Sequence, residues 1–310
     1  MAQAAVPHQP PESPWGYRPN QSINVIFLVS FFTSIVGLQV ISLYTRQWLK
    51  FSIPLSVACL FELVGYAARA GSSTSPLDVR LFAVTTFFLT IAPSFISTSI
   101  YVTAERTFYV FGKEHSLIDP KWYASFVCID AISLVLQVVG LVVAYWDIAA
   151  MNRVGLDSNN GGGVIAAGLV IQAIMLMIFL LLFSYAMAQG FVAWREFGYT
   201  TFNPRRGGYR RLGWPCILFL VVVVFSVCSL LARNIYRTVG FVRSFDGGNN
   251  SEAAFALCDG LLVSLAVLGL LVLHPSYVFS DYSKEKDADK LSSSASSGPS
   301  FGRIMQQGVV

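Results

Sequence analysis

Charged side chains lie inside long apolar stretches of this sequence, and their spacing groups them. Glu62, Gly65, Tyr66 and Arg69 follow one another at helical intervals within ELVGYAAR, so one face of a helix would carry all four. An ionisable side chain at the centre of a membrane helix costs about 2.5–3.5 kcal/mol on insertion scales. Leu, Ile, Phe and Val each return only about 0.3–0.6 kcal/mol. Each such charge therefore requires a partner, the interior of a helix bundle or water.

Two later apolar stretches carry further charges. Arg233 and Arg237 lie in RNIYR, and Glu252 and Asp259 lie two helical turns apart at the start of the last apolar stretch. With the topology given below, these four residues, Glu62 and Arg69 all fall in the outer half of the membrane. Three acids thus face three arginines. They predict either a structural ion-pair network that fixes helix packing or a solvated, outward-facing binding cavity.

A proline and a stripe of hydroxyl groups mark another apolar stretch. Pro93 leaves a backbone carbonyl without its helical donor and bends the axis. Ser and Thr in such helices often bond their own backbone or pack closely against neighbours. The alternative is a polar lining for a substrate path beside the kink. The stripe at i, i+3, i+4 and i+7 consists of Ser94, Ser97, Thr98 and Tyr101.

Asp130 and Gln137 share a helix face in the following apolar stretch. Asp130 has no basic partner within its own helix, so it would pair with Arg106, titrate as a proton-coupling group or remain protonated. Gln172 is expected to form an interhelical hydrogen bond in preference to a ligand contact. His274, before Pro275, is expected to mark the end of the last membrane helix.

Seven apolar stretches of about bilayer length must position these residues. The chain is 55% hydrophobic and only 12% charged, against about 25% charged residues in soluble domains. Helices are required because unpaired backbone groups are not tolerated in lipid. The sequence thus predicts an all-α bundle at 22–280, an extracellular tail at 1–21 and a disordered cytoplasmic tail at 281–310. The predicted spans are 22–44, 50–69, 80–104, 122–146, 163–188, 214–238 and 253–274.

The distribution of basic residues predicts the orientation. With the N-terminus outside, 14 of the 21 Lys and Arg residues lie on the cytoplasmic side, which favours this topology. The densely basic loop Arg205–Arg211 contributes most to this bias. Two glycosylation sequons, at Asn20 and Asn249, fall on the predicted outer side, close to a span.

Several classes of function lack their motifs. No nucleotide-binding loop, hydrolase elbow or zinc-protease motif appears, and no basic stripe suits nucleic acid. We therefore expect no enzyme activity, no metal, no cofactor and no nucleic-acid partner. No Cys-x-x-Cys pair occurs, and each cysteine is expected to be a small buried hydrophobe. The cysteines are Cys59, Cys128, Cys216, Cys228 and Cys258.

Several motifs resemble those of one known family in order and spacing. They are ELVGYAAR, IAPSFISTSIY, the Asp130–Gln137–Gly140 stretch, the Gly168–Gln172 pair, RNIYR and the Glu252–Asp259–His274–Pro275 series. Together they resemble the fungal RTA-like lipid-translocating exporters, a group that includes sphingoid long-chain-base exporters and aminocholesterol-resistance proteins. The resemblance covers about residues 22–280. It implies seven spans, an outside N-terminus, and transport of or resistance to amphipathic lipids.

The leading hypothesis is a multi-pass plasma-membrane protein that exports amphipathic lipids or lipid-like toxic compounds. A cationic sphingoid head group suits a carboxylate-lined site. The alternatives are a seven-helix receptor or lipid sensor that signals through the basic loop and serine-rich tail, and an intramembrane enzyme. Asp130 is the candidate proton-coupling acid. The candidate substrate-binding residues are Glu62, Arg69, Ser94, Ser97, Thr98, Tyr101, Gln172, Arg233, Arg237, Glu252 and Asp259.

Overall fold

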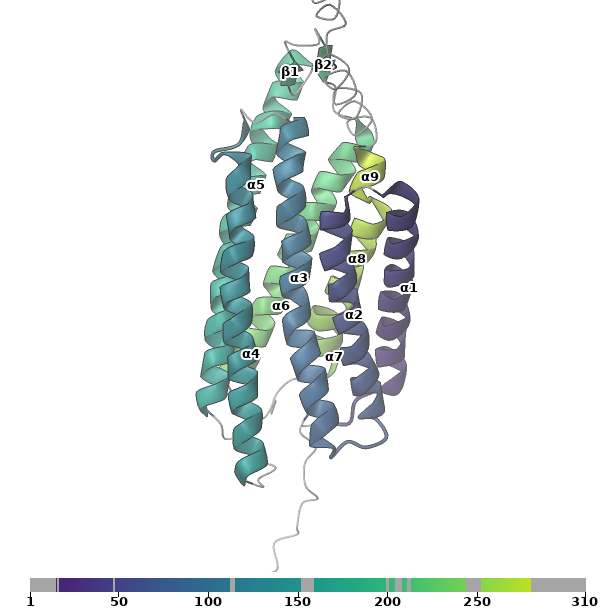
Figure 1. Ribbon diagram of the computed structural model, residues 1–310, viewed down its shortest axis with the longest axis vertical. Helices are drawn as coiled ribbons and strands as arrows, with labels where there is room; N and C mark the ends of the chain where they lie inside the picture. Colours follow the sequence, from purple (N-terminus) through teal and green to yellow (C-terminus); the bar gives the residue numbers. More distant parts are fainter. Residues whose placement is uncertain are drawn as a thin grey trace, which may run out of the picture.

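The protein is a bundle of long helices in a computed structural model (Figure 1). The structure describes residues 15, 17–46, 48–111, 115–151, 159–198, 201–203, 208–210, 213–243 and 252–279. Within these described residues, seven segments are long and apolar enough to cross a membrane, which confirms the predicted spans. The first six helices are α1 (Gln21–Thr45), α2 (Leu49–Gly71), α3 (Val79–Phe111), α4 (Ser125–Met151), α5 (Asn159–Phe197) and α6 (Trp214–Arg243).

The seventh span is not one regular helix. It consists of α7 (Glu252–Phe255), the π-helix η3 (Ala256–Leu261), α8 (Leu262–Val272) and the short α9 (Pro275–Val278). His274 caps α9, because its Nδ1 accepts a hydrogen bond from the Ser276 backbone N–H at 3.2 Å. The expectation that this histidine marks the end of the main helix is therefore confirmed.

A short hairpin, which the sequence analysis did not anticipate, connects α5 to α6. Its strands β1 (Thr201–Asn203) and β2 (Gly208–Arg210) are antiparallel, with Thr201 opposite Arg210. The hairpin lies at the upper end of the bundle in Figure 1, which we call the hairpin end. The 3₁₀ helix η2 (Pro120–Ala124) precedes α4 at the same end. Much of the basic loop Arg205–Arg211 lies outside the described residues, as do Asn249 and the tail from residue 280 onward.

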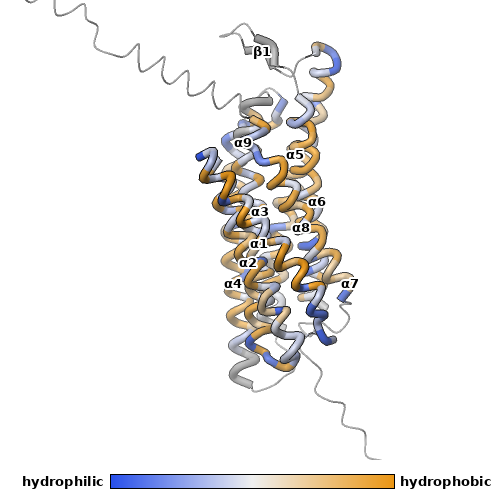
Figure 2. The backbone as a smooth tube through the Cα atoms, turned by 90° about the vertical axis from the view of Figure 1, so that its right-hand side faces the viewer, coloured by the Kyte–Doolittle hydropathy of each residue, from blue (hydrophilic) through white to orange (hydrophobic). Residues whose placement is uncertain are grey.

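The helices follow one another around the bundle. α1 packs between α2 and α8, and α3 packs on α2 and α4 while also reaching α5 and α6. Hydrophobic residues run along most of the length of the bundle (Figure 2). Many large apolar side chains point outward, among them Ile26, Ile132 and Val221, which are 65%, 60% and 59% exposed. This apolar exterior suits a lipid environment.

Small residues bring α4 and α5 into close contact. A Cβ atom added at Gly140 would lie 2.7 Å from the Ile165 backbone nitrogen, and one added at Gly161 would lie 2.7 Å from the Ala144 Cα. At Gly168 it would lie 2.9 Å from the Ser133 carbonyl oxygen. Such contacts drive helix association in membranes, where lipid removes most of the hydrophobic incentive.

Candidate functional site

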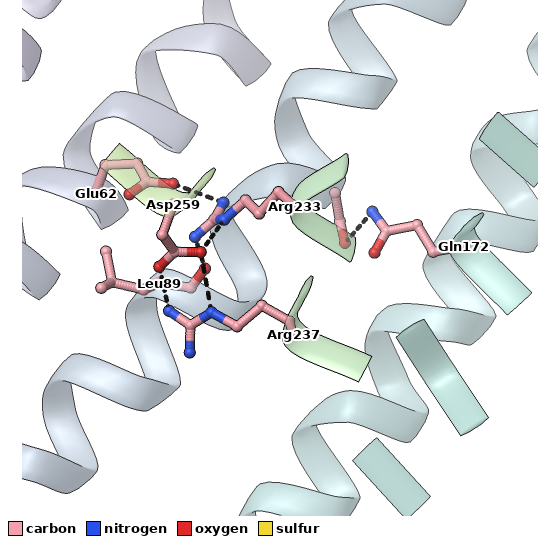
Figure 3. Close-up of polar contacts among 7 residues, drawn as sticks. Glu62, Leu89, Gln172, Arg233, Arg237 and Asp259 are labelled. Carbon is pink, nitrogen blue, oxygen red and sulfur yellow. Dashed lines mark hydrogen bonds and ion pairs between the residues drawn. The ribbon is translucent and has the colours of Figure 1, made fainter. Parts of the chain in front are cut away.

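Four charged residues from α2, α6 and η3 form an ionic cluster, defined as Glu62, Arg233, Arg237 and Asp259 (Figure 3). Arg233 donates from Nη1 to Glu62 Oε1 at 2.9 Å and from Nε to Asp259 Oδ1 at 2.6 Å. Arg237 donates from Nε to Asp259 Oδ1 at 2.9 Å and from Nη2 to Oδ2. Asp259 therefore joins both arginines, and Arg233 joins both acids.

Pro93 explains a further bond of this cluster. Proline has no backbone N–H, so the carbonyl four residues earlier in a helix loses its normal donor. That carbonyl belongs to Leu89, and its oxygen accepts a hydrogen bond from Arg233 Nη2 at 2.5 Å (Figure 3). The freed carbonyl expected at the kink thus has a partner in α6, and the ionic cluster ties α3 to α2, α6 and the seventh span.

The ionic cluster is closed and balanced in charge. Glu62 and Asp259 are 0% exposed, Arg233 is 1% and Arg237 13% exposed. Two carboxylates face two guanidinium groups, so the ionised cluster carries no net charge. These contacts pair all four charged groups without a ligand, and Glu62 Oε2 is left without a hydrogen-bond partner among the described residues. A substrate-binding role for them stays a prediction, and it requires a conformation in which the pairs separate.

Arg69 lies apart from the acids of the ionic cluster and contacts the N-terminal segment, which we define as the described residues from Trp15 to Asn20. Its guanidinium group lies 3.7 Å from the centre of the Phe255 ring and 4.2 Å from that of Trp15, and Nη2 donates to the Tyr17 hydroxyl at 2.6 Å. Burial raises the pKa of the Tyr17 phenol, although the neighbouring Arg69 opposes that shift, so Tyr17 is a neutral hydroxyl at physiological pH. No pattern in the sequence indicated that aromatic rings would surround Arg69.

The rest of the N-terminal segment is also tied to the bundle. The Asn20 backbone N–H donates to Glu252 Oε1 at 2.5 Å, and Arg18 Nε donates to the Ser73 carbonyl at 2.9 Å. Asn20 also caps α1 by accepting from the Ser22 backbone N–H at 2.9 Å. Glu252 is therefore engaged at the bundle end, outside the ionic cluster.

Replacing Tyr17 by phenylalanine is expected to lower the stability of the fold by roughly 1.5–3 kcal/mol, the typical contribution of a hydrogen bond to a charged group. The ring remains, so its packing near Arg69 is kept while the hydrogen bond is lost. The measurement is the thermal melting of the purified protein in detergent, with Tyr44→Phe as the control because Tyr44 is 87% exposed. Equal melting of the two variants would contradict the role assigned to Tyr17.

A second polar group lies deeper among the helices and connects α3, α4 and α5. Ser97 Oγ donates to Asp130 Oδ2 at 2.5 Å. Gln172 Nε2 donates to Ser94 Oγ at 3.2 Å, and Gln137 Nε2 donates to Gln172 Oε1 at 3.1 Å. The last two bonds confirm that Gln172 makes interhelical hydrogen bonds. On the buried face of α4, Ser133 Oγ donates to the Gly168 carbonyl at 2.6 Å, next to the close contact of α4 and α5.

Some hydroxyl groups of the stripe form hydrogen bonds to the backbone of their own helix, α3. Thr98 Oγ1 donates to the Ser94 carbonyl at 2.7 Å, and Ser97 Oγ lies 3.0 Å from the same oxygen. Because a hydroxyl has one proton, Ser97 can donate either to this carbonyl or to Asp130. An ionised Asp130 would accept a hydrogen bond from the Ser97 hydroxyl. A protonated Asp130 would instead donate to the Ser97 oxygen, and the Ser97 hydroxyl could then donate to the Ser94 carbonyl. The local geometry thus accommodates both protonation states of Asp130.

Asp130 is buried without a described basic partner. It is 1% exposed, and its Oδ1 has no hydrogen-bond partner among the described residues. The side chain of Arg106, one partner that the sequence suggested, lies outside the described part of the chain. The Tyr101 hydroxyl interacts electrostatically with Asp130, and its ring packs 4.9 Å from that of Phe179.

A cavity of about 310 Å³ lies beside Asp130, between α2, α3 and α4. Its wall is apolar except for one carboxylate and two hydroxyl groups. Sequence reasoning identified these polar residues but not the apolar wall, because nothing in an apolar run indicates which side chains leave space between them. The lining residues are Ile53, Pro54, Val57, Ser94, Phe95, Thr98, Val127, Asp130, Ala131 and Leu134.

Comparison with known proteins decides the family. The model of the RTA1-like proteins matches residues 55–282, most of the chain. The chain belongs to the RTA1-like family. Among its relatives in Saccharomyces cerevisiae, the sphingoid long-chain base transporter RSB1 of strain Lalvin EC1118 is 27% identical over 85% of this chain and 74% of the relative. Protein RTM1 is 29% identical over 74% of this chain and 69% of its own length.

A third relative, protein RTA1 of strain S288c, is 27% identical over 72% of this chain and 65% of its own length. No solved structure matches the chain. The segment that matches the RTA1-like model contains the ionic cluster, Asp130 and every residue of the cavity wall except Ile53 and Pro54. The N-terminal segment around Trp15 and Tyr17 precedes it.

Proposed function

We propose that this RTA1-like protein moves amphipathic lipids or lipid-like toxic compounds across the plasma membrane, as a resistance-type exporter. The RSB1 relatives are named sphingoid long-chain base transporters, and this supports transport of a lipid. It also favours a transporter over an enzyme. The basic loop and serine-rich tail on which the sensor alternative depends lie largely outside the described residues, so no structural observation favours that alternative.

The cavity beside Asp130 carries the proposal. A substrate with a polar head and an apolar chain needs a site that offers both environments within the membrane. The cavity combines an apolar wall with the Asp130 carboxylate and the Ser94 and Thr98 hydroxyls. Water-filled channels for ions or small polar solutes have no need of such a wall.

We assign two separate roles to the polar groups. Asp130 and the Ser97 hydroxyl would take part in substrate handling and proton coupling, because their geometry serves both protonation states. The ionic cluster and the N-terminal segment would hold the bundle closed on the side away from the hairpin end. Movement of a head group past the ionic cluster would require the bonds of Arg233 to exchange partners.

Reconstituted protein is expected to accelerate the transbilayer movement of a fluorescent long-chain base in liposomes. The rate is measured by quenching of the outer leaflet with and without protein, and a fluorescent phosphatidylcholine serves as the control lipid. Tags near residue 246 and in the C-terminal tail would report the orientation of the same preparation. A monodisperse, folded protein that leaves the rate of the long-chain base unchanged would refute transport and favour the sensor alternative.

A further inference from the structure

The cavity opens at the lipid-facing surface of the bundle. Ile53 of α2 is 57% exposed, Ala131 of α4 is also exposed, and both line the cavity. α2 and α4 both pack on α3 but make no extensive contact with each other. A lateral opening between α2 and α4 therefore leads from the bilayer to Asp130. It lies in the half of the bundle nearer the hairpin end, because both helices begin there (Figure 1).

The base of this opening carries a carboxyl group that no described basic residue pairs with, and the Tyr101 hydroxyl interacts with it electrostatically. Asp130 Oδ2 accepts from Ser97, while Oδ1 is buried and has no hydrogen-bond partner among the described residues. The other buried acids, Glu62 and Asp259, each form an ion pair with Arg233, although Glu62 Oε2 also lacks a hydrogen-bond partner among the described residues. Every other described residue of the cavity wall is neutral. An ionised carboxylate in such a place recruits a cationic group that can donate hydrogen bonds.

The volume limits how much of a lipid can enter. A cavity of about 310 Å³ holds roughly ten groups of the size of a water molecule, at about 30 Å³ each. A long-chain amine has more heavy atoms than this. Its head and the first carbons fit, and the remaining chain must leave between Ile53 and Ala131 into the bilayer.

We propose that this opening is a lateral binding site for a long-chain primary amine. The ammonium group lies against Asp130 Oδ1, hydroxyl groups next to the amine lie near Ser94 and Thr98, and the alkyl chain extends between α2 and α4 into the lipid. The inference rests on the proposed transport function and adds to it the residue that holds the amine head group and the route by which the lipid enters. Charge complementarity at one buried acid favours a cationic amphiphile over an alcohol or a phosphate ester of equal chain length.

Direct binding tests the site independently of transport. Purified full-length protein in lipid nanodiscs is titrated with radiolabelled sphinganine, and competition is measured with octadecylamine, octadecanol and octadecyl phosphate. Octadecylamine is expected to compete, and the alcohol and the phosphate are expected to compete at least tenfold more weakly. Asp130→Asn should weaken sphinganine binding about tenfold or more, since a charge-assisted bond is lost. Glu196→Gln, at an exposed acid of α5, is the control and should bind normally.

A second variant keeps the carboxylate and blocks the opening. Ala131→Phe places a ring in the mouth of the cavity and should weaken sphinganine binding at least fivefold. Ile132→Phe, at the neighbouring exposed position that does not line the cavity, should not. Because Ala131 is exposed, its variant tests the site even where Asp130→Asn does not fold.

The outcomes separate the two proposals. Normal binding by Asp130→Asn or by Ala131→Phe overturns the lateral amine site, whether or not the protein moves lipid. Binding that depends on Asp130 and Ala131 supports the site, and if the wild-type protein then fails to accelerate transbilayer movement, the transport function alone is refuted.

Discussion

Replacement of Arg233 by methionine is expected to remove most of the folded protein from the membrane. Arg233 is 1% exposed and donates to Glu62, Asp259 and the carbonyl that Pro93 leaves free. Without it, one arginine faces two buried carboxylates, and the Leu89 carbonyl loses its donor. Removal of one partner from a buried ion pair typically costs about 3–5 kcal/mol. The fold is not expected to tolerate that loss.

The measurement is the yield of monodisperse protein and its melting temperature in detergent. Arg195→Met is the control, because Arg195 is exposed near the end of α5. The double variant Arg233→Met/Glu62→Gln should recover part of the yield, since it leaves Arg237 and Asp259 as a balanced pair. Normal yield and melting of the single variant would contradict the structural role of the ionic cluster.

Asp259 belongs to the same ionic cluster. If Asp259 acted only in substrate binding, Asp259→Asn would reduce transport and leave the protein level normal. In the structure Asp259 accepts hydrogen bonds from both Arg233 and Arg237. Loss of its charge would leave two buried guanidinium groups facing one carboxylate, so the protein level is expected to fall as well.

Replacement of Gly161 by leucine should separate α4 from α5. A Cβ at this position would lie 2.6 Å from the Ala144 Cβ and 2.7 Å from its backbone nitrogen. A backbone atom cannot move aside as a side chain can, so the helices must part and lose the neighbouring contact at Gly140. Overpacking commonly costs about 1–3 kcal/mol, and here it also removes the contacts that hold two membrane helices together.

Gly163 provides a matched comparison two residues away in α5. A Cβ there meets no atom within 4 Å, so Gly163→Leu should be tolerated and should gain up to about 1 kcal/mol of helix propensity. Thermal melting and size-exclusion profiles of the two variants test the difference. If Gly161→Leu melts like Gly163→Leu, the close approach of α4 and α5 is not required for the fold.

Helical spacing predicted which residues share one face of α2. Glu62, Gly65, Tyr66 and Arg69 share the buried face of α2, as their spacing indicates. The positions of the spans could also be predicted from the sequence, because the length of an apolar stretch reflects the thickness of the bilayer. The hairpin β1–β2 and the π-helical turn at Asp259 were not anticipated, because neither has a compositional signal as strong as a bilayer-length apolar run.

The choice of partners could not be read from the sequence. Three acids and three arginines in one half of the membrane allow several pairings, and the axial position of each helix selects among them. Arg69 meets Trp15, Tyr17 and Phe255 instead of an acid. The cavity likewise lies at Asp130, apart from the ionic cluster. An acid is left without a basic partner when none of the helices packed around it places a base nearby, and that depends on the packing of all the helices.

The separation of Glu62 and Arg233 along the chain has a consequence for biogenesis. The two residues are 171 positions apart, which corresponds to roughly 10–30 s of translation at about 5–20 residues per second. Throughout that time the nascent chain holds a carboxylate in its second span before the complementary arginine has left the ribosome. Insertion of the early spans is therefore expected to rely on the translocon or a membrane chaperone until α6 and the seventh span arrive.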